Sequence, residues 1–285
     1  MVAAGVAVFF FRQSGGGGEV FLQAASAEGK DPFTQSTAKG YGSAASAAPA
    51  EPRGTGSGVR SVQGSTPGIY GGTRNNASCD VERQIGYLKQ DQAKARAFAG
   101  AASIGPSDLA TFLRGLTPVA LRADTRVTNH GYQDGSVTSF QSVLQAGTAV
   151  LVDEHGAPRV RCACGNPLGA PTAVKGSLTA KGDHWPGYRS SGLVAIKPAE
   201  SDLEALVLYD TENQQWFERP TGSKGEDDRL VAPPKDGVPT APSQSASSPA
   251  SQSPSKSPSS TAPSPKPPGP PSPPPAYGAP PLRPN

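Results

Sequence analysis

The sequence is poor in several residue types that would point to a particular chemistry. It has three cysteines, three histidines, two tryptophans and one methionine among 285 residues. No carboxylates cluster in the pattern of a metal site, and the glycine-rich runs lack the lysine of a phosphate-binding loop. Basic residues are spread among acidic ones, with a net charge of +3, and form no patch that indicates nucleic-acid binding. The sequence therefore predicts no cofactor, no metal and no nucleic-acid partner.

The sequence also lacks an apolar run long enough to cross a bilayer. Its longest run, Val2–Phe11, is VAAGVAVFFF, about half of the roughly 20 residues that a spanning helix needs. No basic residues precede it, and Arg12 and a run of four glycines follow. We interpret residues 1–18 as a partial membrane anchor and flexible linker whose start codon lies upstream of Met1; a short core strand is the alternative. The anchor interpretation predicts an extracytoplasmic protein, membrane-anchored or secreted, that meets the membrane through this segment only.

Composition divides the rest of the chain. Residues 231–285 are dominated by Pro, Ser, Ala and Gly, which offer too little apolar surface to offset the entropy of ordering, so we expect a disordered tail. Residues 38–66 are similarly rich in Gly, Ser and Ala, and we expect a loop. The sequence therefore predicts a single domain over residues 19–230.

Apolar spacing predicts three short helices followed by strands. Val81, Ile85 and Leu88 recur at helical spacing after a predicted N-cap at Ser78; a second helix follows Asp91, and a third runs from Pro106 to Leu116. Alternating or continuous apolar runs predict strands at 19–25, 148–152, 158–162, 192–197 and 205–209 and from Trp216 onward. The expected fold class is α+β, with a small N-terminal helical subdomain followed by an antiparallel sheet built from hairpins.

Four blocks of the sequence resemble a known family. They are CDVERQIGYL, LRADTRVTNHGY, FQSVLQAGTAVLVDEHGAPRVRCACGNPL and FERPTG. The chain resembles an uncharacterised actinobacterial family of exported or membrane-anchored proteins, a domain of unknown function, over about residues 19–225. The resemblance implies a single extracytoplasmic domain behind a membrane segment; it implies no activity.

The cysteines favour a disulfide. A bridge across Cys162-Ala163-Cys164 would close a strained small ring, so Cys79 is expected to pair with Cys162 or Cys164. Such a bridge would close a loop of about 84 residues, worth roughly 4.5 kcal/mol in the chain-entropy model. Cys162 is the preferred partner because it lies two residues after Val160 on the inward face of the predicted strand, whereas Ala163 would point outward and Cys164 would begin a turn.

Two other interpretations of the cysteines stay open. Zinc could be bound by Cys79, Cys162, Cys164 and one of the three histidines, His130, His155 or His184. A thiol hydrolase could use Cys79 at a helix N-terminus as nucleophile, His130 as base, and Asp124 or Asp134 to orient it. No local signature of a cysteine-peptidase family accompanies these residues.

These patterns favour a non-enzymatic recognition or structural domain at the bacterial cell envelope. Its partner would be an envelope protein or glycan. A glycan could be bound by aromatic side chains, for which the candidates are Tyr70, Trp185, Tyr188, Trp216 and Phe217. Packing in the core explains the same residues and is the favoured interpretation. The alternative is a cysteine-dependent hydrolase acting on envelope peptides.

Overall fold

The computed structural model describes residues 18–40, 59–173 and 178–235. All of them belong to the first of two compact units, Met1–Ser243, and none to the second, Gln244–Asn285. The apolar run predicted as an anchor and residues 236–285 of the predicted tail lie outside the described residues. No helix in the described ranges combines the length and the apolar character that crossing a membrane requires.

Three α-helices follow one another along the chain, as the spacing predicts. They are α1 (Val81–Lys89), α2 (Gln92–Ala102) and α3 (Leu109–Gly115), the last preceded by the 3-10 turn η2 (Pro106–Asp108). Asp91 caps α2 by accepting bonds from the backbone N–H groups of Ala93 and Lys94. The predicted cap of α1 was wrong: Asp80 accepts from the N–H of Arg83, whereas Ser78 lies too early and donates to the carbonyl oxygen of Val119.

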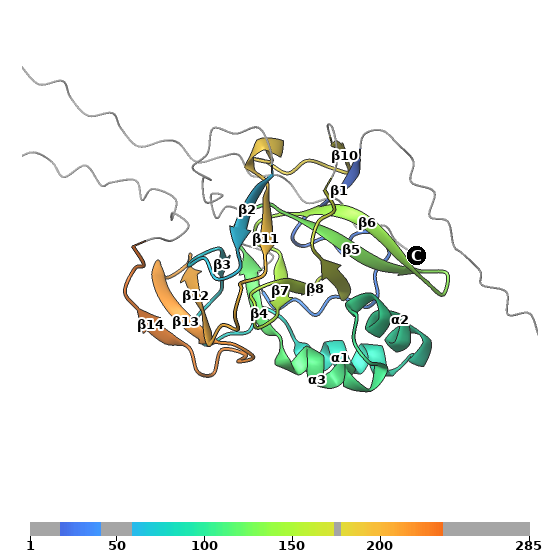
Figure 1. The fold of residues 1–285 in the computed structure, drawn as a ribbon, viewed down its shortest axis with the longest axis horizontal. Helices are drawn as coiled ribbons and strands as arrows, with labels where there is room; N and C mark the ends of the chain where they lie inside the picture. Colours follow the sequence, from blue (N-terminus) through green and yellow to red (C-terminus); the bar gives the residue numbers. More distant parts are fainter. Residues whose placement is uncertain (1–17, 41–58, 174–177, 236–285) are drawn as a thin grey trace, which may run out of the picture. The chain divides into compact units, whose positions relative to one another are not determined.

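The strands form one mixed sheet (Figure 1). Along its main path the order is β10-β1-β6-β5-β9-β8-β7-β4-β3-β12-β13-β14, and β11 branches from β5 and carries β2. The strands are β1 (Glu19–Gln23), β2 (Arg60–Gln63), β3 (Tyr70–Gly71), β4 (Thr117–Leu121), β5 (Thr125–Gln133), β6 (Ser136–Leu144), β7 (Ala149–Val152), β8 (Pro158–Arg161), β9 (Asn166–Gly169), β10 (Thr179–Lys181), β11 (Val194–Lys197), β12 (Ala205–Asp210), β13 (Gln215–Pro220) and β14 (Arg229–Val231); a second 3-10 turn, η3 (Ser190–Gly192), precedes β11.

The prediction of an antiparallel sheet was wrong in part, because several strand pairs are parallel. β1 runs parallel to β6 and β10, and β11 runs parallel to β2 and to the start of β5. β2 lies within the segment predicted as a Gly/Ser-rich loop, where Val62 is buried in the core. Parallel pairs join segments far apart in the sequence, so hairpin signals between neighbours do not reveal them.

The hairpin β5–β6 is formed by the two longest strands of the sheet. All nine residues of β5 pair with β6, and Asp134 and Gly135 form the turn with positive φ angles of 51° and 80°. Both central residues of a type I′ turn adopt positive φ, which Asp-Gly accommodates well. Because β6 occupies one whole edge of β5, every other partner of β5 must use the opposite edge.

The helices share their core with the sheet. Val81, Ile85 and Leu88 pack in one apolar cluster with Leu151 of β7 and Val160 of β8. Cys79 and Cys162 are bridged inside this cluster, with a Cα–Cα separation of 6.0 Å. The described chain is therefore an α+β mixture in which the helices pack against the sheet and share an apolar core with it.

Candidate functional site

A cavity lies where two strands diverge from one edge of β5. β11 pairs with β5 through the single pair Val194–Thr125, and β9 pairs with β5 from Thr128 onward. Arg126 and Val127 have no register partner on this edge. The two strands therefore form a fork, and the space between them is a cavity of about 250 Å³. We call it the fork cavity.

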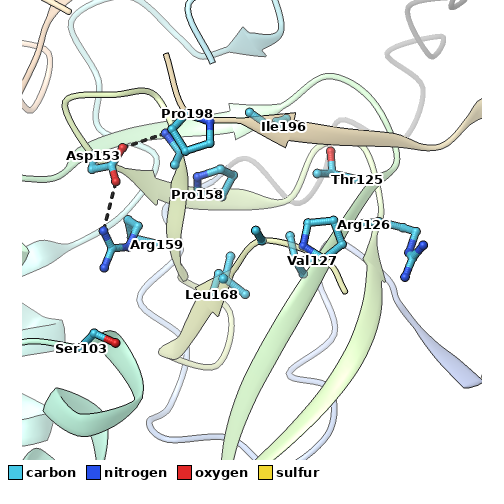
Figure 2. A pocket seen from close by; sticks show the side chains of 14 residues that line it. Ser103, Thr125, Arg126, Val127, Asp153, Pro158, Arg159, Leu168, Ile196 and Pro198 are labelled. Carbon is cyan, nitrogen blue, oxygen red and sulfur yellow. Dashed lines mark hydrogen bonds and ion pairs between the residues drawn. The ribbon is translucent and has the colours of Figure 1, made fainter. Parts of the chain in front are cut away.

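The middle of the fork cavity is apolar, and its two ends carry charge (Figure 2). Its apolar lining consists of Val127, Ala157, Pro158, Leu168, Gly169, Ala170, Pro171, Ile196 and Pro198. Its polar lining consists of Ser103, Thr125, Arg126, Asp153 and Arg159. Figure 2 shows Arg126 at the opposite end from the pair Asp153 and Arg159. An apolar pocket with a few polar groups is the usual form of a small-ligand site.

Asp153 and Arg159 neutralise each other. Arg159 Nη1 lies 3.1 Å from Asp153 Oδ2, and Arg159 Nη2 donates to the carbonyl oxygen of Ala102. Asp153 Oδ1 accepts from the backbone N–H groups of His155 and Ala157. These bonds fix the β7–β8 turn and α2 at one end of the cavity.

Arg126 has no such counter-charge among the residues that the structure describes. Its residue exposure is 6%, and Nη2 donates to two neutral oxygens, Gln141 Oε1 and the carbonyl oxygen of Thr172, each at 3.1 Å. Its Nε is buried without a hydrogen-bond partner among the described residues. Burial lowers the pKa of the Arg126 guanidinium.

The structure confirms the pairing of Cys79 with Cys162 and leaves Cys164 as a free, buried thiol. Cys164 Sγ lies 3.5 Å from Arg161 Nη1. Burial raises the pKa of the Cys164 thiol, although the charge of Arg161 lowers it in part. A bridged Cys79 sulfur is not available as a nucleophile, and a buried thiol with a raised pKa is poorly reactive.

Two details of the cysteine segment were predicted wrongly. Ala163 was expected to point outward but is only 3% exposed, and the turn comprises Cys162–Gly165 because the N–H of Gly165 donates to the carbonyl oxygen of Arg161. Asn166 and Pro167, expected in the turn, begin β9. Residues 34–37 cover the turn through bonds from the N–H groups of Thr34 and Thr37 to the carbonyl oxygens of Cys164 and Cys162, which explains the burial of Ala163.

The structure does not bring together the residues of the predicted hydrolase site. Asp124 directly precedes β5 and His130 lies within it, six positions further along the extended chain, which corresponds to about 20 Å. Asp124 is occupied by the N–H of Ala146 and by Trp185 Nε1, and burial raises its pKa. Burial lowers the pKa of His130, while a backbone bond to Pro167 raises it in part. Asp134 forms the β5–β6 turn.

The residues predicted as zinc ligands do not form a metal site either. Cys79 and Cys162 share a disulfide, and His155 Nε2 lies 3.4 Å from Asp202 Oδ1. His184 is exposed and stacks against Tyr188. Within the described ranges, no three His, Cys, Asp or Glu side chains group as a metal site would require.

The aromatic candidates lie mostly in the interior. Tyr70 is 1% and Phe217 is 0% exposed, and both belong to the central apolar cluster. Trp216 is 9% exposed. Trp185 and Tyr188 contact each other and cover a third cluster beside β1 and β6. These aromatic residues stabilise the core and do not line the fork cavity.

The fork cavity was missed by sequence reasoning because its lining is collected from segments between Ser103 and Pro198. The fold and this site define an α+β domain with a disulfide and a cavity between diverging strands. A family model described as a domain of unknown function, DUF6777, matches residues 60–222. The match covers more than half of the chain, and the chain belongs to this family. Neither the curated proteins nor the solved structures include a match. Both bridged cysteines and all residues that line the fork cavity lie within the matched range.

Proposed function

We propose that this protein is a non-enzymatic recognition domain that acts outside the cytoplasm, at the bacterial cell envelope. The fork cavity is the observation that carries the recognition role. It combines an apolar middle with charged ends, and its lining includes no cysteine or histidine. Its size, about 250 Å³, is slightly below the usual range for ligand pockets and suits a ligand of a few heavy atoms.

The location is supported by the disulfide. Disulfides persist in oxidising compartments and are rare in the cytosol of most organisms. The bridge between Cys79 and Cys162 joins residues 83 positions apart, so it constrains a long loop of the chain. The apolar run Val2–Phe11 is consistent with the same location. In this proposal the domain is anchored by residues 1–18 or secreted, and its partner is an envelope protein or glycan and not a nucleic acid.

A sedimentation assay tests the recognition role. The full-length oxidised protein is incubated with isolated bacterial envelopes, and the fraction that sediments with them is measured. The variant Ala170→Trp places a large side chain at the exposed rim of the fork cavity, and the control Ala93→Trp places the same side chain at an exposed position at the start of α2. We expect Ala170→Trp to reduce envelope binding strongly and Ala93→Trp to leave it unchanged. Equal binding by the two variants would contradict a role for the cavity.

A further inference from the structure

The positive charge of Arg126 is not balanced by a negative charge among the described residues around the fork cavity. The lining contains two arginines and one aspartate, and the aspartate is already paired with Arg159. Within the described part of the chain, Arg126 is left with neutral oxygens of Gln141 and Thr172 and with an unpartnered Nε. A buried cation without an anion carries a desolvation cost that the fold itself does not offset. A ligand anion would offset it.

The remaining donors of Arg126 suit a carboxylate. A guanidinium presents five N–H donors in a planar arrangement that matches a carboxylate, and such charge-assisted bonds are about twice as strong as neutral ones. Both hydrogen bonds that Arg126 donates to described residues come from Nη2. Nε and Nη1 therefore have donors that make no bond within the described residues.

The apolar lining in the middle of the cavity favours a ligand that is apolar apart from its charged group. Val127, Leu168 and Ile196, with three prolines, offer no side-chain donor or acceptor. A ligand rich in hydroxyl groups would leave these groups unbonded there, at a cost for each one. Small aliphatic groups would be accepted without such a cost.

The edge of β5 adds a reason to expect a peptide. Arg126 and Val127 lie between the pair Val194–Thr125 and the pair Thr128–Gly169, and on this edge, opposite β6, no described strand residue is in register with them. An extended peptide can add to such an uncovered edge through main-chain hydrogen bonds. The cavity volume of about 250 Å³ limits the inserted part to one or two small residues.

We propose that the fork cavity binds the C-terminal carboxylate of a short aliphatic peptide, with the carboxylate at Arg126 and a small side chain between β9 and β11. This inference rests on the proposed recognition role of the same cavity. It assigns that role a ligand class and makes Arg126 the residue that determines specificity.

Calorimetric titration of the full-length protein with two probes tests the inference. The probes are N-acetyl-alanyl-alanine, with a free carboxylate, and its C-terminal amide, which differs only in the charged group. We expect the acid to bind at least about tenfold more tightly than the amide, because a hydrogen bond to a charged group is worth more than one to a neutral group. Glucuronate, a carboxylate on a hydroxyl-rich ring, should bind more weakly than the acid peptide.

Two variants connect this preference to Arg126. Arg126→Gln should lose the preference for the acid, whereas Arg96→Gln, which removes an exposed arginine of α2, should retain it. If Arg126→Gln fails to fold, the comparison of acid and amide on the unmodified protein still decides. Equal affinity for acid and amide, or tighter binding of glucuronate, would overturn the inference. The proposed function would survive that result if Ala170→Trp still lost envelope binding.

Discussion

Arg219 and Arg126 are both buried, but the fold completes the surroundings of only one of them. Arg219, in β13, is 0% exposed; its Nε and Nη2 donate to the Asp228 carboxylate at 2.9 and 2.7 Å, and Nη1 donates to the carbonyl oxygen of Pro118. Arg126 meets two neutral oxygens and borders a cavity. Arg219 therefore serves the structure, whereas the surroundings of Arg126 are those that the proposed carboxylate site requires.

Arg161 shows that a missing carboxylate is not sufficient for this conclusion. Its guanidinium is 0% exposed and donates to Gln23 Oε1 and to the carbonyl oxygens of Ala24, Ala27 and Glu28. These acceptors enclose the charge, and Arg161 does not line the fork cavity. Arg161 therefore holds the segment after β1 against β8, whereas Arg126 lines the fork cavity and has an Nε without a partner among the described residues.

The largest effect is expected at Arg219. Arg219→Met removes one partner of a fully buried ion pair and leaves Asp228 as an uncompensated charge. We expect the free energy of unfolding to fall by about 3–5 kcal/mol in denaturant titrations. The control Arg114→Met removes an arginine from the exposed pair with Glu82 and should cause little change. Equal, small losses in both variants would show that the Arg219 pair adds no net stability.

The next largest effect is expected at the disulfide. Cys162→Ser removes the bridge to Cys79 and should lower the free energy of unfolding by roughly 2–5 kcal/mol. Cys164→Ser retains the bridge and should cost less, because the hydroxyl stays near Arg161 Nη1, which contacts the sulfur at 3.5 Å. Thermal unfolding of both variants without reductant measures the difference. Losses of equal size would contradict a structural role specific to the Cys79–Cys162 bridge.

Arg126→Met tests whether Arg126, unlike Arg219, is dispensable for the stability of the fold. Without ligand, the variant loses two bonds to neutral oxygens but also removes a desolvated charge, so the net change in unfolding free energy should be within about 1 kcal/mol. Denaturant titration beside Arg219→Met measures it. A loss as large as that of Arg219→Met would make Arg126 a structural residue.

The smallest effect is expected from His130 as the pH falls. Its pKa in the folded state lies below the ordinary value of 6.5 because of burial, so the folded state binds the proton less readily than the unfolded chain. Its contribution to stability is complete above about pH 6.5 and is lost as the pH falls through the folded-state pKa. His130→Gln lacks this loss. The difference in melting temperature between the unmodified protein and the variant should therefore be constant above about pH 7 and shift in favour of the variant toward about pH 5. A difference independent of pH would contradict the assigned burial effect.

Features that depend on neighbouring residues could be predicted from the sequence. The three helices follow from local apolar spacing, and the choice of Cys162 over Cys164 follows from its position two residues after Val160. The β5–β6 hairpin was missed although Asp134-Gly135 is a strong turn signal for it. β2 was hidden by the Gly/Ser-rich composition around Arg60–Gln63.

The fork cavity could not be predicted in this way. It exists because β9 and β11, more than 20 residues apart, leave the same edge of β5 in different directions. Arg126 resembles any other arginine in the sequence, since only the fold shows that its partners among the described residues are neutral oxygens. The sequence therefore predicted the disulfide, the three helices and the α+β class, and the candidate site came from the structure.

The most direct test of the account observes Arg126 itself. The Nε–Hε groups of Arg126 and Arg161 are both buried without a partner among the described residues, but only Arg126 lines the fork cavity. Their NMR signals, assigned with Arg126→Lys and Arg161→Lys, are followed during titration of the full-length protein with N-acetyl-alanyl-alanine. The account predicts that the Arg126 signal moves with the acid probe and not with the amide, while the Arg161 signal stays in place. A stationary Arg126 signal at saturating acid probe, or equal movement of both signals, would contradict it.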